Sequence, residues 1–210
     1  MCGLSYYVVD LETSGLSSIM HEPTEISIIR CKDRVQLTRM IKCKHPERAN
    51  FDALRITGKT MSDLRNGDDL KDVVEECDKF LKEDNLTREH RCVIGHNIIT
   101  FDKKFLHVMW ASVGKEFPCN LYLDTIPLTK LFAKREGIIT RKFNLHASCD
   151  MLGIKKYAEK HGAKVDTRNN YLLWKALVED KKIDYLPLIK NLPHYIFGEP
   201  SDEELELLDE

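Results

Sequence analysis

Two acidic side chains near the start of the chain lie in a segment with the composition of a buried strand. Asp10 and Glu12 follow the apolar run of residues 6–9, and residues two apart in a strand project from the same face. Adjacent carboxylates repel each other unless a cation or protons lie between them. The competing interpretation is that the strand ends at Val9 and both acids are solvated. The short D-x-E pattern is common, so the pair needs further ligands to indicate chemistry.

Two more carboxylates and a histidine are candidates for the same site. Asp102 opens an expected helix after the apolar run of residues 92–95, where an acid is more often a helix cap. Asp166 shares a helical stripe with Leu173, and an acid on a face that packs against a sheet needs a partner. His161 lies five residues earlier in a glycine-containing loop, where a histidine is usually just exposed.

These four acids could meet at one end of a sheet, because they come from a strand, a strand-to-helix junction and a late helix. Magnesium prefers oxygen ligands and retains several waters, so convergent carboxylates suit it. Two such ions about 3.5–4 Å apart can activate a water and stabilise the leaving oxygen when a phosphodiester is cleaved. A neutral histidine beside that water would supply a base.

The elements that must position these residues indicate an α/β fold with a mixed five-stranded sheet flanked by helices. The composition predicts strands at residues 6–12, 25–31, 35–43, 92–95 and 120–124. Short links between the first three predict an antiparallel meander. Helical patterns cover residues 69–81, 101–113, 127–136, 144–152 and 166–178. Strands that later alternate with helices favour a sheet that also contains parallel strands.

The composition of the 210 residues, 42% hydrophobic and 31% charged, predicts one domain with one core. We expect this domain to span residues 1–183 and to be followed by an extension over residues 184–210. Residues 199–210 hold seven acids, and the rest of the chain carries 32 basic against 27 acidic side chains. A mildly basic body is compatible with a polyanionic partner but proves nothing alone. The acidic tail is either a solvated terminus or a docking segment for a polymerase, clamp or helicase.

Cysteine usage and hydropathy predict a soluble, intracellular protein. The seven cysteines are scattered without a C-x-x-C pair, which favours reduced thiols. The chain has no apolar run of about 18 residues, and its first residues lack the features of a signal peptide. We expect a cytoplasmic location, or a nuclear one if the source is eukaryotic.

Three segments of the chain form a recognisable set of motifs: VVDLETSGL at residues 8–16, GHNIITFD at residues 95–102 and HGAKVD at residues 161–166. Together they resemble the DnaQ-like (DEDDh) exonuclease family, which includes the proofreading subunit of bacterial replicative polymerase, RNase T and the TREX nucleases. The resemblance covers roughly residues 4–180 and implies an RNase H-like fold. The second motif has three residues between Asn97 and Phe101, as TREX-like members have, where the bacterial proofreading subunit commonly has two.

The resemblance also implies a role for each catalytic candidate. Asp10 would bridge two Mg²⁺ ions, for which Mn²⁺ would substitute. Glu12 and Asp166 would complete the first metal site, and Asp102 the second. His161 would deprotonate the attacking water, a role that typically contributes about 10²–10⁴-fold in rate.

A set of substrate-binding residues around the terminal nucleotide is implied in the same way: Leu11, Thr13, Ser14, Gly15, Leu16, Asn97 and Phe101. Backbone amides of residues 13–15 would approach the nucleotide, and Leu16 would wedge against its base. Asn97 and Phe101 would shape the pocket.

The expected function is therefore metal-dependent 3′→5′ hydrolysis of single-stranded DNA, of the proofreading or end-trimming type, which releases nucleoside 5′-monophosphates. One alternative is an exoribonuclease of the RNase T or oligoribonuclease type, because contacts to the 2′-hydroxyl decide the sugar. Another is a non-catalytic, polymerase-associated module that binds nucleic acid. That alternative predicts a broken carboxylate set, whereas all five catalytic positions are filled.

Overall fold

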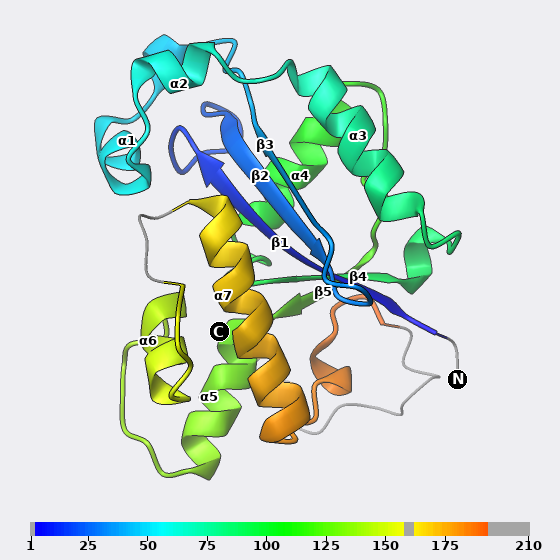
Figure 1. Ribbon diagram of the computed structural model, residues 1–210, viewed down its shortest axis with the longest axis vertical. Helices are drawn as coiled ribbons and strands as arrows, with labels where there is room; N and C mark the ends of the chain where they lie inside the picture. Colours follow the sequence, from blue (N-terminus) through cyan, green and yellow to red (C-terminus); the bar gives the residue numbers. More distant parts are fainter. Residues whose placement is uncertain (1–2, 158–161, 193–210) are drawn as a thin grey trace.

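The computed structural model describes residues 3–157 and 162–192 and contains one five-stranded sheet of order β3-β2-β1-β4-β5. The strands are β1 (Ser5–Thr13), β2 (Pro23–Arg30), β3 (Gln36–Met40), β4 (Arg91–Gly95) and β5 (Leu121–Asp124). The first three pair antiparallel, and β1, β4 and β5 pair parallel. The mixed sheet expected from the sequence is confirmed (Figure 1).

Helices cover both faces of the sheet, because the central strands bury side chains on each side. Tyr7 and Val9 pack with α3 (Leu70–Lys82) and α4 (Asp102–Ala111) in one core. Val8 belongs to a second core on the other face. Three helices contribute to this second core, namely α5 (Thr125–Arg135), α6 (Leu145–Met151) and α7 (Ala163–Lys175). The β-branched and aromatic residues of β1 therefore form the shared wall of two apolar layers.

Two short helices between β3 and α3 were not expected from the sequence. They are α1 (Phe51–Thr57) and α2 (Met61–Arg65). Asn50 caps α1 through two backbone amides, and Thr60 begins α2 with a capping box. The helix α1 buries none of its residues. Its sequence therefore lacks the apolar periodicity from which an amphipathic helix is predicted.

The last helix begins earlier than expected. Residues 166–178 were predicted to be helical, whereas α7 starts at Ala163 and a π-helical turn, Ala176–Asp180, follows it. Asp166 therefore lies in the first turn of α7, the helix that packs across β1 and β2. The position of this turn places the acid beside the carboxyl end of β1 (Figure 1).

Three-residue 3-10 helices complete the described chain at Pro46–Arg48, Arg88–His90 and Leu186–Leu188. Residues beyond the expected domain end at 183 still contact the sheet, since Tyr122 and Lys190 exchange two backbone hydrogen bonds. The acidic segment 199–210 lies outside the described residues.

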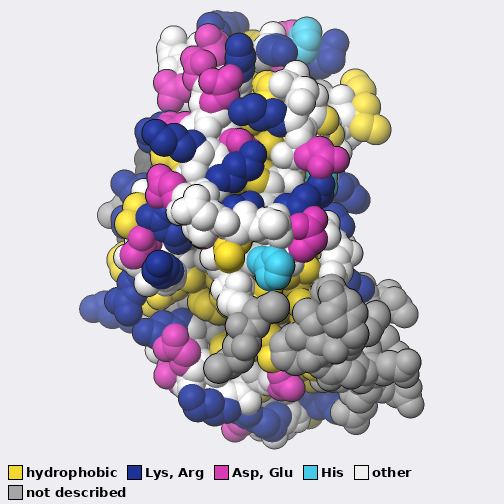
Figure 2. All heavy atoms as spheres, turned by 90° about the vertical axis from the view of Figure 1, so that its right-hand side faces the viewer, with side chains coloured by type: hydrophobic (Ala, Val, Ile, Leu, Met, Phe, Trp, Pro, Cys, Tyr) yellow, Lys and Arg dark blue, Asp and Glu magenta, His cyan; other side chains and the backbone are white. Residues whose placement is uncertain are grey.

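The charged surface on the side where α3 lies has Lys and Arg side chains interspersed with Asp and Glu (Figure 2). This face therefore does not present the uniformly basic surface that would attract a polyanion. Among the described helices, none has both the length and the apolar character needed to cross a membrane.

Candidate active site

Three acidic side chains converge at the carboxyl end of β1. Asp10, Glu12 and Asp166 each offer a carboxylate oxygen, and these oxygens lie within 4.8 Å of one another. All three residues are half-buried. The strand continues to Thr13, so the interpretation that it ends at Val9 is wrong. The shared strand face positions the first two acids, and the packing of α7 on β1 brings in the third.

Asp102 reaches the same part of β1 from α4. Its Oδ1 accepts a hydrogen bond from the Leu11 amide at 3.1 Å, and the residue is only 4% exposed. This amide is accessible because the pairing of β1 with β4 ends at Val8 and Ile94. The separation of the two parallel strands thus makes room for a fourth carboxylate beside Asp10.

The electrostatics of this cluster favour positive charge or protons. Burial, followed by the neighbouring Asp102, Glu12 and Asp166, raises the pKa of Asp10 well above its ordinary value. Burial, with Asp166 and Glu25, raises the pKa of Glu12 to about 7. Burial also raises the pKa of Asp102 to about 8. Divalent cations would stabilise the ionised carboxylates, which both burial and the neighbouring acids disfavour.

The donor set fits hard divalent cations. Asp10, Glu12 and Asp166 offer only carboxylate oxygens at their convergence, and such oxygens are the ligands that Mg²⁺ and Mn²⁺ prefer. Asp102 adds a fourth acid within interaction range of Asp10. The sequence-based expectation of a carboxylate metal site therefore agrees with the chemistry of the residues that the fold assembles.

A fifth acid and a lysine adjoin the cluster, and sequence reasoning missed both. Glu25 on β2 lies directly opposite Glu12 in the strand register. Its Oε2 accepts a hydrogen bond from Lys59 Nζ at 2.7 Å. A signal for Glu25 was available, since it begins an expected strand paired with the one that carries Glu12. Nothing in the local sequence around Lys59 indicated this contact.

A histidine other than the expected one lies at the site. His146 on α6 places its Nε2 3.6 Å from Asp166 Oδ1. The helix that carries it was predicted, but nothing in the spacing connected His146 with Asp166. His161, the expected general base, lies outside the described residues.

The expected substrate-binding loop is held by hydrogen bonds of its own. Thr13 Oγ1 donates to the Gly15 carbonyl at 2.7 Å, and the Ser14 amide donates to the Glu22 carbonyl at 2.8 Å. A Cβ at Gly15 would lie 2.3 Å from the His21 ring, so any larger residue there would require this ring to move. Leu16 follows with 83% of its surface exposed.

Asn97 and Phe101 lie on the turn between β4 and α4. The φ angle of Asn97 is 69°, in the left-handed region that asparagine tolerates, and its amide donates to Asp124 Oδ1 at 3.0 Å. The Phe101 ring packs against Phe105 at 5.2 Å between centroids. The preceding His96 is structural, because its two ring nitrogens contact Thr125 Oγ1 and the Phe143 carbonyl.

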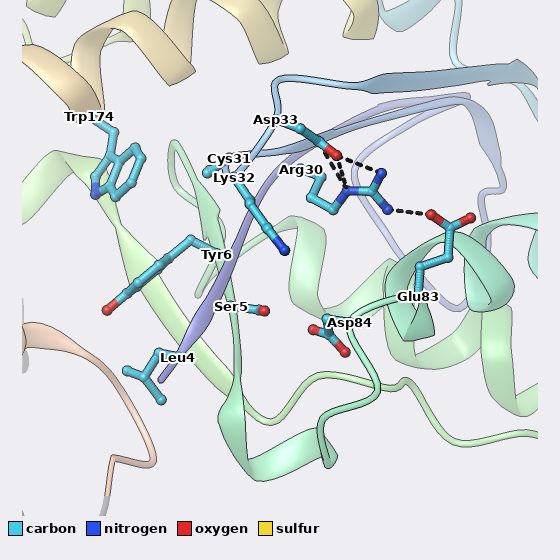
Figure 3. Close-up of a pocket in the computed structure, with 10 residues that line it drawn as sticks. All are labelled: Leu4, Ser5, Tyr6, Arg30, Cys31, Lys32, Asp33, Glu83, Asp84 and Trp174. Atoms are coloured by element: carbon cyan, nitrogen blue, oxygen red, sulfur yellow. Dashed lines mark hydrogen bonds and ion pairs between the residues drawn. The ribbon is translucent and has the colours of Figure 1, made fainter. Parts of the chain in front are cut away.

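A cavity of about 490 Å³ lies elsewhere, around the start of β1 and the end of β2, and Leu4, Tyr6 and Trp174 form its apolar side (Figure 3). Its acids are ion-paired: Asp33 and Glu83 both contact Arg30. This arrangement provides no convergent carboxylates, so the cavity is not the candidate catalytic site.

Solved structures share this fold. The complex of E. coli exonuclease I with a dA16 oligonucleotide matches with a TM-score of 0.72 and 16% identity, over 97% of this chain and 45% of that chain. The zinc-bound form of the E. coli exonuclease I–ssDNA complex matches with a TM-score of 0.71 and 17% identity, over 86% and 41% of the two chains. These likenesses confirm the expected RNase H-like architecture.

Curated relatives with sequence similarity are DNA polymerases III of the PolC type. The Listeria monocytogenes protein is 26% identical over 201 residues, which cover 91% of this chain and 12% of the polymerase. The Thermotoga petrophila protein is 28% identical over 193 residues, which cover 90% of this chain and 13% of the polymerase. This chain therefore spans about an eighth of the length of these relatives.

The family model RNase_T, described as an exonuclease, matches residues 7–174. This range includes most of β1, the turn before α4 and the first turn of α7, and hence all four clustered acids. The family that the three motifs resembled is thereby confirmed. The chain belongs to the RNase_T family of exonucleases.

Proposed function

We propose that this chain is a metal-dependent 3′→5′ exonuclease that removes nucleoside 5′-monophosphates from single-stranded DNA. The observation that carries the proposal is the convergence of carboxylate oxygens from Asp10, Glu12 and Asp166 within 4.8 Å. Such a cluster is costly in the absence of cations, and it lies within the part of the chain that matches the exonuclease family.

In this proposal Asp10, Glu12 and Asp166 would hold one Mg²⁺ ion, and Asp102 together with Asp10 would hold a second. When bound, these ions would lower the pKa of the attacking water and stabilise the leaving 3′ oxygen. The Leu11 amide orients Asp102 by occupying its Oδ1. Such an orienting hydrogen bond limits the ways in which the carboxylate can turn toward a cation.

His161 takes the proton from the attacking water in our proposal. A histidine suits this role, because its ordinary pKa near 6.5 leaves much of it neutral at physiological pH. His146 is the second candidate, since its Nε2 already lies 3.6 Å from Asp166. Variants of the two histidines distinguish these assignments.

The loop of residues 13–16 would receive the terminal nucleotide. Because the Ser14 amide is bonded to Glu22, we assign Ser14 to shaping the loop. The exposed Leu16 would pack against the terminal base. Leu11, Thr13 and Gly15 are buried, so we propose that they frame the sugar and phosphate through their backbone, and that Asn97 with Phe101 closes the opposite wall. Apolar and backbone contacts of this kind tolerate any base.

Two comparisons support a DNA substrate. The relatives in sequence are DNA polymerases by name, and two of the similar solved structures are named as complexes with ssDNA and with a dA16 oligonucleotide. The sugar preference depends on contacts to the 2′-hydroxyl. A direct comparison of DNA with RNA therefore forms part of the test.

The test incubates the full chain with single-stranded DNA and RNA of one sequence, labelled at the 5′ or the 3′ end. Mg²⁺, Mn²⁺ or EDTA is added. We expect a ladder of shortening 5′-labelled DNA, immediate release of the 3′ label as a mononucleotide, and no reaction in EDTA. Faster degradation of RNA than of DNA would instead support the alternative that the chain is an exoribonuclease. Activity that persists in EDTA would contradict the metal mechanism.

We also propose that the acidic segment 199–210 binds a replication protein such as a polymerase. The support is its charge, with seven acids and no basic residue, and the polymerase context of the sequence relatives. The measurement is binding of the full chain, and of a chain that ends at Gly198, to a purified replicative polymerase. Equal affinities would reject a role for the segment.

A further inference from the structure

A buried ion pair lies beside the carboxylate cluster but outside its proposed ligands. Lys59 Nζ and Glu25 Oε2 are 2.7 Å apart, and the two side chains are only 8% and 11% exposed. Glu25 lies opposite Glu12 on the neighbouring antiparallel strand, at a separation at which side chains interact directly. The pair therefore belongs to the electrostatic surroundings of the cluster.

The backbone around Lys59 is fixed on both sides. Its amide donates to the Leu54 carbonyl at 3.1 Å, directly after Gly58, the C-cap of α1, whose φ is 67°. Thr60 then begins α2 with a capping box. The ammonium group also lies 3.4 Å from Met40 Sδ. A lysine buried among such neighbours requires a charged partner, and Glu25 supplies it.

Lys59 affects the balance of charge at the site. Two divalent cations would balance the four charges of Asp10, Glu12, Asp102 and Asp166. Glu25 adds a fifth negative charge that raises the pKa of both Asp10 and Glu12, whereas Lys59 lowers the pKa of Glu12. With Lys59 bound to Glu25, the surplus charge is neutralised, and a carboxylate that could compete with Glu12 is occupied.

We propose that Lys59 is a positioning residue for the metal site, because it holds Glu25 in an ion pair and so keeps a fifth carboxylate away from the cations. The inference rests on the proposed metal-dependent function. It assigns a task to the loop between α1 and α2 that none of the three motifs contains. Without Lys59, Glu25 would attract a cation toward β2 and away from the geometry that the other acids define.

The test measures Mn²⁺ binding calorimetrically with the metal-free full chain, and exonuclease activity in parallel. For Lys59→Met we expect about tenfold tighter Mn²⁺ binding, because a negative charge is uncovered at the site. We expect kcat to fall about tenfold with little change in KM. The double variant Glu25→Gln/Lys59→Met should return both quantities to near the wild-type values. The matched control is Lys82→Met, which removes a lysine from the Asp78 ion pair on α3, and it should change neither quantity.

Equal Mn²⁺ affinity in the wild type and in Lys59→Met would overturn the inference, and so would a double variant no better than the single one. A purely structural ion pair predicts both of these results. If Lys59→Met does not fold, Glu25→Gln alone decides the question, because the uncovered lysine should weaken Mn²⁺ binding about tenfold. Unchanged binding would again reject the inference. A wild type that binds no Mn²⁺ would overturn the proposed function together with it.

Discussion

The acidic side chains at the two ends of the central strand β1 differ in the charge of their partners. At its carboxyl end Asp10 and Glu12 face Asp166, another acid. At its amino end the acids face arginines, since Arg30 Nη2 lies 2.8 Å from Asp33 and Arg91 Nη2 lies 2.7 Å from Asp84. Figure 3 shows Asp33 and Glu83 both directed at the Arg30 guanidinium.

The pKa directions follow this difference. Burial and neighbouring acids raise the pKa of Glu12 to about 7. Burial acts in the same direction on Asp84, but Arg91 and the Leu86 amide hold its pKa below the ordinary value. Asp33, beside Arg30, also has a lowered pKa. The amino end uses its acids to stabilise the fold, whereas the carboxyl end keeps unfavourable charges together, as a metal site requires.

The largest effect should come from the centre of the carboxylate cluster. We expect Asp10→Asn to lower kcat/KM by about 10⁴-fold, because a misplaced cation would forfeit about 5 kcal/mol of transition-state stabilisation. Asp33→Asn is the matched control at the opposite end and should retain wild-type activity. Steady-state rates on 5′-labelled DNA measure both. Equal losses of kcat/KM in the two variants would contradict a functional difference between the two ends of β1.

The histidines sharpen the assignment at the carboxyl end. We expect His161→Gln to lower kcat by about 10²–10⁴-fold, as removal of a general base typically does. His146→Gln should cost less than about tenfold, because His146 contacts the proposed ligand Asp166 and not the attacking water. Rates at saturating substrate and Mg²⁺ provide the measurement. The reverse order of losses would make His146 the base.

The amino end should respond in stability instead of activity. Arg91 is 3% exposed, so Arg91→Met would leave Asp84 buried beside no guanidinium and lower the free energy of unfolding by about 3–5 kcal/mol. Arg30→Met breaks pairs whose acids are 41% and 47% exposed, and it should cost at most about 1 kcal/mol. Urea titration measures both variants. A specific activity per folded molecule that falls with Arg91→Met would contradict the separation of the two ends.

The smallest expected effect is the dependence of protein stability on pH and on bound metal. In the folded chain the pKa of Glu12 rises from 4.5 to about 7 and that of Asp102 from 3.8 to about 8. The folded state therefore binds more protons than the unfolded state between about pH 4 and pH 8, and stability from these groups is lost as the pH rises through that window. The ion-paired acids of the amino end lose their contribution only at lower pH.

We accordingly expect the Tm of the metal-free chain to fall by several degrees between pH 5 and pH 8. Saturating Mg²⁺ should raise Tm more at pH 8 than at pH 5, and Asp166→Asn should flatten the metal-free slope. Thermal unfolding followed by circular dichroism gives all three quantities. A Tm without pH dependence in this range would show that the cluster is not strained.

The sequence alone was sufficient for features that depend on local spacing. The two-residue period of a strand placed Asp10 and Glu12 on one face, and the short links among the first three strands predicted the antiparallel part of the sheet. The sequence also placed Asp102 at the start of a helix and Asp166 in the first turn of another. The sequence analysis did not predict the short helices α1 and α2, because capping hydrogen bonds and not an apolar face define them.

Only the tertiary structure decided which groups meet. The contact of Asp102 with the Leu11 amide spans 91 residues of sequence, and it exists because β4 diverges from β1. The Lys59–Glu25 pair and the approach of His146 to Asp166 likewise join different elements. Spacing within one strand or helix determines which side chains share a face, whereas the packing of separate elements determines the electrostatic partner of each charge. For that reason the sequence predicted Asp10, Glu12, Asp102 and Asp166 as candidate ligands, whereas only the fold shows that three of them converge and that Glu25 faces Lys59 instead.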